Sequence, residues 1–202
     1  ESEDVRTLSF FGSPSPSTTS INETGQTYKI NLSYTPNENT LVYGQWAEGF
    51  RIGRGQAEGA ACVVAGFPTP SEINSDTSEN FELGLKTSLI DNRITLNTAL
   101  YRIDWEGITV TVNPVGSCFQ ILNAGKAQSE GVELELQGRL TENFQFDMSA
   151  SYGESTLEEN SSIGNKGDNL PGSADVNASI GLQYAFTLAG HDSFARIDYV
   201  YI

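Results

Sequence analysis

The stretch VELELQGRLTENFQFDMSASY, residues 132–152, carries the clearest structural signal in this chain. On both sides of Thr141-Glu142-Asn143, apolar side chains occupy every second position. They are Val132, Leu134, Leu136 and Leu140 before the turn, then Phe144, Phe146, Met148, Ala150 and Tyr152 after it. Successive side chains of a strand leave opposite faces of the pleat, so this alternation predicts a β-hairpin with one apolar and one polar face.

The same alternation recurs elsewhere, which places the hairpin in a larger sheet. It covers residues 28–34, 81–89, 94–100 and 176–186, and residues 78–85 resemble residues 129–136 as an approximate internal repeat. Tight turns at 36–39, 91–92, 141–143 and 189–191 alternate with long polar connections at 51–77 and 154–172 and with a shorter one at 114–118. Short turns at one end of a sheet and long loops at the other are typical of an outer-membrane β-barrel. We therefore predict an all-β antiparallel meander of long hairpins with about eight strands.

In a barrel wall, the parity of a residue decides whether it meets lipid or the lumen. We expect Leu134, Leu136, Phe146, Met148, Ile180 and Leu182 to share the lipid-facing surface. Glu133, Glu135, Asp147 and Gln183 should then face the lumen. Two segments break the pattern, because apolar residues occupy both parities in 41–50 and change phase within 94–105. Either a bulge or a strand that rises out of the membrane would produce this, and the sequence leaves both open.

Composition excludes several classes of function. The chain has 202 residues, 26 acidic against 11 basic side chains and a net charge of -15, which argues against nucleic acid as a partner. No apolar stretch is long enough for a transmembrane helix, and no secretory signal opens the chain, so we expect a mature or truncated protein. Membrane strands need only about 10 alternating residues each, so this composition is compatible with a barrel.

Catalytic motifs are equally scarce. The single histidine, His191, lies in an expected tight turn, which removes histidine-based triads and multi-histidine metal sites. The run 49–55 is glycine-rich but lacks the Gly-Lys-Ser/Thr ending of a phosphate loop. Glu133 with Glu135, and Glu154 with Glu158 and Glu159, are better explained as solvated carboxylates than as a glycosidase pair. We expect no enzymatic activity, no metal and no cofactor.

Two features lie outside the strand pattern. Cys62 and Cys118 both fall in expected long loops, where a disulfide and two free thiols are the alternatives. Residues 1–27, which include the Ser/Pro-rich stretch 9–20, are poorly patterned and should form a loop or irregular end.

Several longer segments together resemble a known family. They are LVYGQWAEGFR at 41–51, FELGLKTSLIDNRITLNTALYRI at 81–103, NAGKAQSEGVELELQGRL at 123–140 and the Leu-Pro-Gly segment at 170–172. In order and spacing they resemble the carboxy-terminal half of the barrel of TonB-dependent outer-membrane receptors, over most of residues 28–201. The resemblance implies a barrel of about 22 strands in the Gram-negative outer membrane, with a plug domain in its lumen. It also implies active uptake of a scarce ligand, usually a ferric siderophore and sometimes cobalamin, haem or a glycan, powered through an energy-transducing TonB complex.

The resemblance also sets expectations for domains and partners. Residues 1–202 would be a partial barrel domain, with an irregular end at 1–27 and hairpins at 28–202, without the plug. Eight strands cannot close a barrel of that size, so the chain would be a fragment with open edges. Its partners would be outer-membrane lipid, its own plug, the TonB complex and a small-molecule ligand, with an iron chelate as the best guess.

Candidate site residues follow from this arrangement. Arg51, Arg54, Trp46 and Lys166 are candidates for ligand binding near the external loops, although solvated arginines and interfacial aromatics are alternatives. Glu82, Lys86, Glu133 and Glu135 should face the lumen, where the resemblance places contacts with the plug. Their simplest role is paired charges on adjacent strands. A passive porin-like barrel and a soluble lectin-like or adhesin-like β-sheet module remain alternatives to the receptor.

Overall fold

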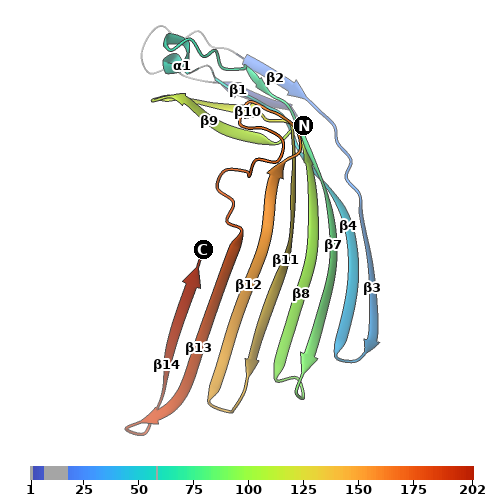
Figure 1. Cartoon of the computed structure of the whole chain (residues 1–202), viewed down its shortest axis with the longest axis vertical. Coiled ribbons are helices and arrows are strands. Elements are labelled where there is room, and N and C mark those ends of the chain that lie inside the picture. Colours follow the sequence, from blue (N-terminus) through green and yellow to red (C-terminus); the bar gives the residue numbers. More distant parts are fainter. Residues whose placement is uncertain (1, 7–17, 58) are drawn as a thin grey trace.

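The computed structural model describes residues 2–6, 18–57 and 59–202 and is built around one eight-stranded antiparallel sheet (Figure 1). The order across the sheet is β14-β13-β12-β11-β8-β7-β4-β3, so every strand lies beside a neighbour in chain order. The strands are β3 (Lys29–Asn37), β4 (Thr40–Arg51), β7 (Asp76–Leu89), β8 (Ile94–Glu106), β11 (Lys126–Arg139), β12 (Phe144–Leu157), β13 (Val176–Leu188) and β14 (His191–Tyr201). The predicted antiparallel meander of long hairpins is confirmed.

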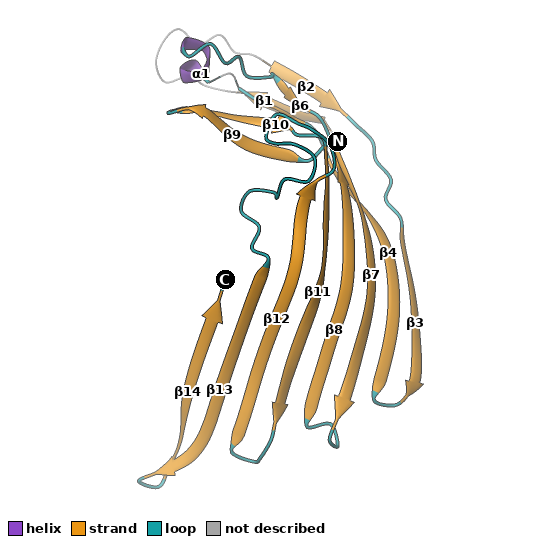
Figure 2. Cartoon of the chain, in the orientation of Figure 1, coloured by secondary structure: helices purple, strands orange, loops and turns teal. Residues whose placement is uncertain are grey.

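Short turns join the strands at one end of the sheet, and long connections gather at the other (Figure 2). The β4–β7 connection contains β5 (Arg54–Gly55), the short helix α1 (Ala60–Val64) and β6 (Glu72–Ile73). The β8–β11 connection is itself a hairpin of β9 (Thr109–Val115) and β10 (Cys118–Asn123). Over the described ranges, no helix combines the length and apolarity needed to cross a membrane.

The prediction for residues 1–27 was partly wrong. β1 (Ser2–Arg6) and β2 (Thr18–Asn22) pair antiparallel as a two-stranded sheet. The alternation that reveals the long strands is missing from these five-residue segments, whereas backbone pairing places no demand on side-chain polarity. Residues 1 and 7–17 lie outside the described residues.

Cross-strand register gives each face of the sheet a consistent character. One continuous row of directly opposed residues runs through Leu32, Gly44, Leu83, Leu100, Val132, Tyr152 and Val176. The adjacent row, on the opposite face, runs through Ser33, Tyr43, Gly84, Ala99, Glu133, Ser151 and Asn177. We call the face with Leu83 the outer face and the face with Glu133 the inner face. Leu136, Met148 and Ile180 oppose one another on the outer face, as the parity predicted.

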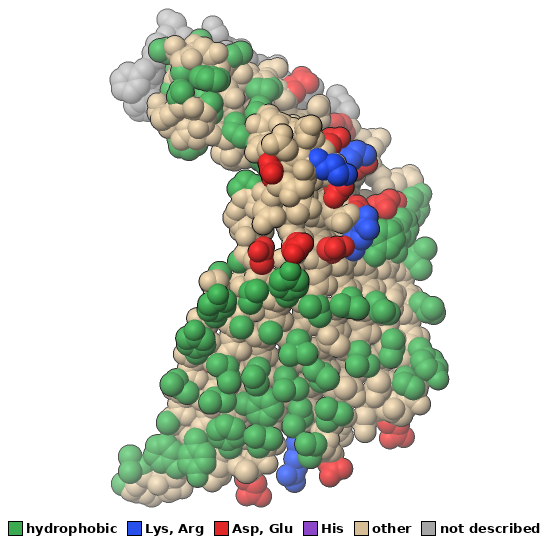
Figure 3. Space-filling view, in the orientation of Figure 1, with side chains coloured by type: hydrophobic (Ala, Val, Ile, Leu, Met, Phe, Trp, Pro, Cys, Tyr) green, Lys and Arg blue, Asp and Glu red, His purple; other side chains and the backbone are tan. Residues whose placement is uncertain are grey.

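Among the residues that the structure describes, no second layer packs over the apolar outer face. Leu83 and Leu100 are each 56% exposed. Figure 3 shows hydrophobic side chains spread over the lower part of this view, with charged side chains above and a few at the turns below. A soluble sandwich would bury such a face against a second sheet, whereas a barrel wall presents it to lipid.

The phase change in residues 94–105 does not come from a bulge. β8 pairs without a register shift along its whole length, with β7 on one side and β11 on the other. Ile94, Leu96 and Leu100 lie on the outer face, whereas the outer face above them carries Arg102 and Asp104 instead. The strand therefore continues beyond the apolar band, which is the second of the two alternatives. In β4, the pairing with β7 is likewise continuous from Thr40 to Arg51.

A small buried core lies at the loop end of the sheet. Ile108, Ala124 and Ala127 form it, and Trp105, Val110, Ile163 and Leu170 pack against it. Trp105 directly opposes Ala127, so both lie on the inner face. The core therefore fastens the β9–β10 hairpin and the β12–β13 connection to the inner side of the strand ends.

Candidate functional site

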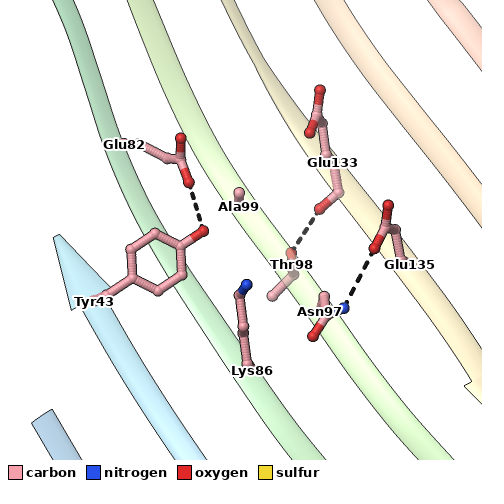
Figure 4. Close-up of a pocket in the computed structure, with 8 residues that line it drawn as sticks. All are labelled: Tyr43, Glu82, Lys86, Asn97, Thr98, Ala99, Glu133 and Glu135. Atoms are coloured by element: carbon pink, nitrogen blue, oxygen red, sulfur yellow. Dashed lines mark hydrogen bonds between the residues drawn. The ribbon is translucent and has the colours of Figure 1, made fainter. Parts of the chain in front are cut away.

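A polar patch occupies the inner face where β4, β7, β8 and β11 run side by side (Figure 4). We define the inner-wall patch as Tyr43, Glu82, Lys86, Asn97, Glu133 and Glu135, which border a shallow hollow of about 140 Å³. The Tyr43 hydroxyl donates a hydrogen bond to Glu82 Oε1, and Asn97 Nδ2 donates to Glu135 Oε2 at 3.3 Å. The four residues expected to contact a plug, Glu82, Lys86, Glu133 and Glu135, thus lie together on this face.

Charge in the inner-wall patch is unbalanced. It holds three carboxylates, Glu82, Glu133 and Glu135, against the single ammonium of Lys86. The expectation of paired charges is wrong for Lys86, since no ion pair joins its ammonium to a carboxylate in the described part of the chain. Its Nζ lies 5.7 Å from the centre of the Tyr43 ring, a cation–π distance.

Another charged cluster on the inner face consists of one arginine paired with two carboxylates. Arg196 on β14 contacts Asp147 on β12 at 2.9 Å and Asp198 on its own strand at 2.6 Å. Its guanidinium reaches across Gly181 of the intervening β13, where a side chain would overlap it. In the inner-wall patch, by contrast, no ion pair within the described residues involves any of the three carboxylates.

A second polar cluster lies at the base of the external loops. Arg51, at the end of β4, forms an ion pair with Asp76, at the start of β7, and its Nε lies 3.0 Å from Asp76 Oδ2. Asp76 is only 4% exposed. Arg51 also donates to Thr109 Oγ1 and lies 5.8 Å from the centre of the Trp105 ring. The charge of Arg51 therefore has a partner within the chain, and the cluster ties together four chain segments.

The other predicted ligand residues lie apart. Trp46 directly opposes Phe81 and Ile30 on the outer face, whereas Arg51 lies on the inner face. Arg54 is an exposed residue of β5. Lys166, in the β12–β13 connection, forms an ion pair of 3.1 Å with Glu158. The four residues do not converge on one pocket, and their role in ligand binding stays a prediction.

Two glutamines that the sequence did not single out fasten the β4–β7 connection to the β9–β10 hairpin. The Gln56 side chain donates to Ile121 O at 3.1 Å and accepts from Ile121 N at 2.8 Å. Gln120 Nε2 donates to Phe67 O at 2.6 Å. These bonds join residues 53 to 65 positions apart in the chain, so no local sequence signal could have revealed them.

A disulfide reinforces the same junction. It joins Cys62 of α1 to Cys118 of β10, with their Cα atoms 4.6 Å apart. Of the two alternatives left by the sequence, the structure contains the disulfide. The β4–β7 connection and the β9–β10 hairpin therefore form one unit, which we call the tied loop unit.

Charged residues also line the outer face directly above the apolar band (Figure 3). Arg102 opposes Glu130, and its Nη2 contacts Asp104 at 2.9 Å. This hydrogen bond to Arg102 lowers the pKa of the Asp104 carboxyl group. Higher up, the Glu106 carboxylate raises the pKa of the Lys126 ammonium. Within the described ranges, no group of three or more His, Cys, Asp or Glu side chains is arranged to hold a metal ion.

An apolar face without a cover, a polar inner face and long loops at one end define the wall of a membrane β-barrel. The family model for the TonB dependent receptor-like β-barrel matches residues 3–202. The chain belongs to this family of outer-membrane receptors, whose members are not enzymes.

Relatives among characterised proteins are siderophore and metal receptors. The probable TonB-dependent siderophore receptor PiuA of Acinetobacter baumannii is 24% identical over 137 residues, which cover 66% of this chain and 18% of PiuA. The metal-pseudopaline receptor CntO of Pseudomonas aeruginosa is 28% identical over 133 residues, 63% of this chain and 18% of CntO. The matched segments thus span less than a fifth of the length of either receptor.

Solved structures show the same fold. The ferric yersiniabactin uptake receptor FyuA from Yersinia pestis matches with a TM-score of 0.73 at 17% identity, over 91% of this chain and 26% of FyuA. The siderophore receptor PiuA from A. baumannii matches with a TM-score of 0.65 at 22% identity, over 86% of this chain and 26% of PiuA.

Proposed function

We propose that this chain is part of the barrel wall of a receptor that takes up an iron chelate, such as a ferric siderophore, across the outer membrane. The observation that carries the proposal is the uncovered apolar outer face combined with external loops fastened to the inner side of the strand ends. Membership of the receptor family and the siderophore receptors among its relatives support it. The expected alternatives, a passive porin-like barrel and a soluble β-sheet module, lack this support.

The connections at 51–77 and 154–172 are proposed to form part of an external ligand vestibule. Barrel walls are fixed by backbone hydrogen bonds, so recognition falls to the loops above them. The test shortens residues 159–169 to a Gly/Ser linker in the full-length receptor, with the 141–143 turn at the opposite end altered as a control. With ferric siderophores as the sole iron source, cells with the shortened 159–169 loop should fail to grow, whereas cells with the altered 141–143 turn should grow normally. Unchanged growth at normal surface levels would contradict the vestibule role.

Energy coupling separates active uptake from passive passage. Uptake of the same chelates should fall to background in cells that lack the energy-transducing TonB complex. Uptake that persists there would support the passive porin-like barrel.

The inner-wall patch is proposed to bind cationic side chains of a plug domain. Its three carboxylates outnumber its single ammonium, and in the described part of the chain none of them forms an ion pair, unlike Asp147, which pairs with Arg196. Carboxylates bind guanidinium and ammonium groups through charge-assisted hydrogen bonds. Glu82→Gln and Glu133→Gln should loosen the plug and raise the ion leak of the full-length receptor in planar bilayers. Glu142→Gln, in the distant β11–β12 turn, is the matched control and should leave the leak unchanged.

A further inference from the structure

Tyr43 lies flat across a glycine on the neighbouring strand. It directly opposes Gly84 of β7, and a Cβ atom at position 84 would overlap ring atoms Cε1 and Cζ and the hydroxyl oxygen of Tyr43. The ring can occupy this place only because residue 84 has no side chain. Gly44, the outer-face glycine next to Tyr43, differs: a Cβ atom there would meet nothing within 4 Å.

The ring of Tyr43 interacts with both charged residues that flank Gly84. Glu82 and Lys86 flank Gly84 on the same face of β7. The Tyr43 hydroxyl hydrogen-bonds to Glu82, and Lys86 Nζ lies 5.7 Å from the ring centre. Figure 4 shows the tyrosine hydroxyl directed at Glu82, with Lys86 beside the same ring. One side chain from β4 thus restrains two charged groups of β7.

A second tyrosine repeats the arrangement one row higher. Tyr101 directly opposes Glu82 on the next strand, β8. Cβ atoms at Gly131 and Gly153 would lie 2.8 Å and 2.6 Å from its hydroxyl oxygen. Side chains on this part of the inner wall therefore lie along a floor of glycine and Ala99, and the carboxylates of Glu82 and Glu133 border the space above it.

We propose that Tyr43, seated on Gly84, is a positioning residue that holds the Glu82 carboxylate in the orientation in which a cationic partner meets it, while the Lys86 ammonium stays over the tyrosine ring. The inference rests on the proposed plug contact for what that partner is. Groups fixed before binding lose less rotational freedom when the complex forms, so the same charges bind more tightly.

The first test asks whether the missing side chain at Gly84 is what allows the Tyr43 ring to lie there. In the full-length receptor, Gly84→Ala should lower the melting temperature of the barrel when Tyr43 is present. In the Tyr43→Ala background, Gly84→Ala should have no further effect, because nothing remains for its methyl group to overlap. Gly44→Ala should be neutral in both backgrounds. Equal losses from Gly84→Ala with and without Tyr43 would overturn the proposal.

The second test asks whether Tyr43 acts through Glu82. Tyr43→Phe keeps the ring and removes only the hydroxyl, so its effect on the ion leak in planar bilayers should match that of Glu82→Gln. Each should raise the leak by about tenfold, the factor expected for the loss of one charge-assisted hydrogen bond. The double variant should leak no more than the larger single effect, whereas multiplied effects would overturn the positioning role. An unchanged leak in Glu82→Gln would instead refute the plug contact. The melting temperatures of the Gly84→Ala variants would then be the only test of whether Gly84 makes room for the Tyr43 ring.

Discussion

Replacing Leu136 by arginine tests the assignment of the outer face to lipid. Leu136 directly opposes Met148, which lies midway between Phe144 and Tyr152, the aromatic residues at the two ends of the apolar stretch of β12. An arginine there would sit near the middle of the hydrocarbon layer, where it costs about 2–4 kcal/mol. That cost corresponds to a loss of about 30-fold to several hundred-fold in the folding equilibrium constant.

The adjacent residue supplies the internal control. Gln137 lies on the inner face, where it opposes Thr95 and Asp147. Gln137→Arg places the same charge beside a carboxylate in a polar lumen, so its cost should be about 0–1 kcal/mol. Leu136→Ala separates the lost leucine from the gained charge.

Equilibrium folding of the full-length receptor into lipid vesicles, followed against urea concentration, measures all three variants. The reasoning predicts a large cost for Leu136→Arg and a small one for Gln137→Arg. Equal costs at the two positions would refute the assignment of faces.

Three further predictions concern the loop end of the sheet. Cys62→Ser removes a disulfide that closes a separation of 56 residues, so it should destabilise the tied loop unit by about 4 kcal/mol; faster proteolysis within residues 52–75 measures this. Asp76→Asn removes the buried carboxylate that pairs with half-exposed Arg51, so it should cost about 1–3 kcal/mol and increase proteolysis at the same sites, whereas unchanged cleavage would contradict the role of the pair. The pKa of Asp104 is lowered in the folded state, so its stabilising contribution is present above its unfolded pKa and is lost as the pH falls through the folded pKa; Arg102→Gln should raise that pKa towards the ordinary carboxyl value in an NMR titration.

The strand portions near the short turns could be predicted from the sequence, because within the apolar band each face of the sheet meets only one kind of surroundings. Lipid selects apolar residues on one parity, and the lumen tolerates polar residues on the other, so period two survives in the sequence. The sidedness of Trp46 could not be predicted, since apolar residues of β4 occupy both parities. Its place beside Phe81 follows from the register with β7, which only the assembled sheet defines.

For the candidate sites, too, the sequence predicted which face some residues lie on but not the contacts they make. Parity placed Glu82, Lys86, Glu133 and Glu135 on one face, but it could not show that Lys86 lies over a tyrosine from another strand instead of pairing with a carboxylate. That contact forms because the register between β4 and β7 places Tyr43 directly opposite Gly84. The contacts of the tied loop unit depend on side chains that reach backbone groups far along the chain, for which periodicity carries no information.

The height of the apolar band explains why the strand portions inside it alternate regularly between apolar and polar residues, whereas the portions beyond it, towards the long loops, do not. On β12, the outer face is aromatic at Phe144 and Tyr152, a distance of about 26 Å along the strand at roughly 3.3 Å per residue. With the usual strand tilt of about 35–45°, this spans about 20 Å across the membrane, close to the apolar band of roughly 25 Å found in outer-membrane barrels. On β8, the band ends between Leu100 and Arg102, and the strand continues to Glu106. Above that level, lipid no longer demands apolar residues outside, so the inner face can carry the apolar contacts that hold the external loops in place.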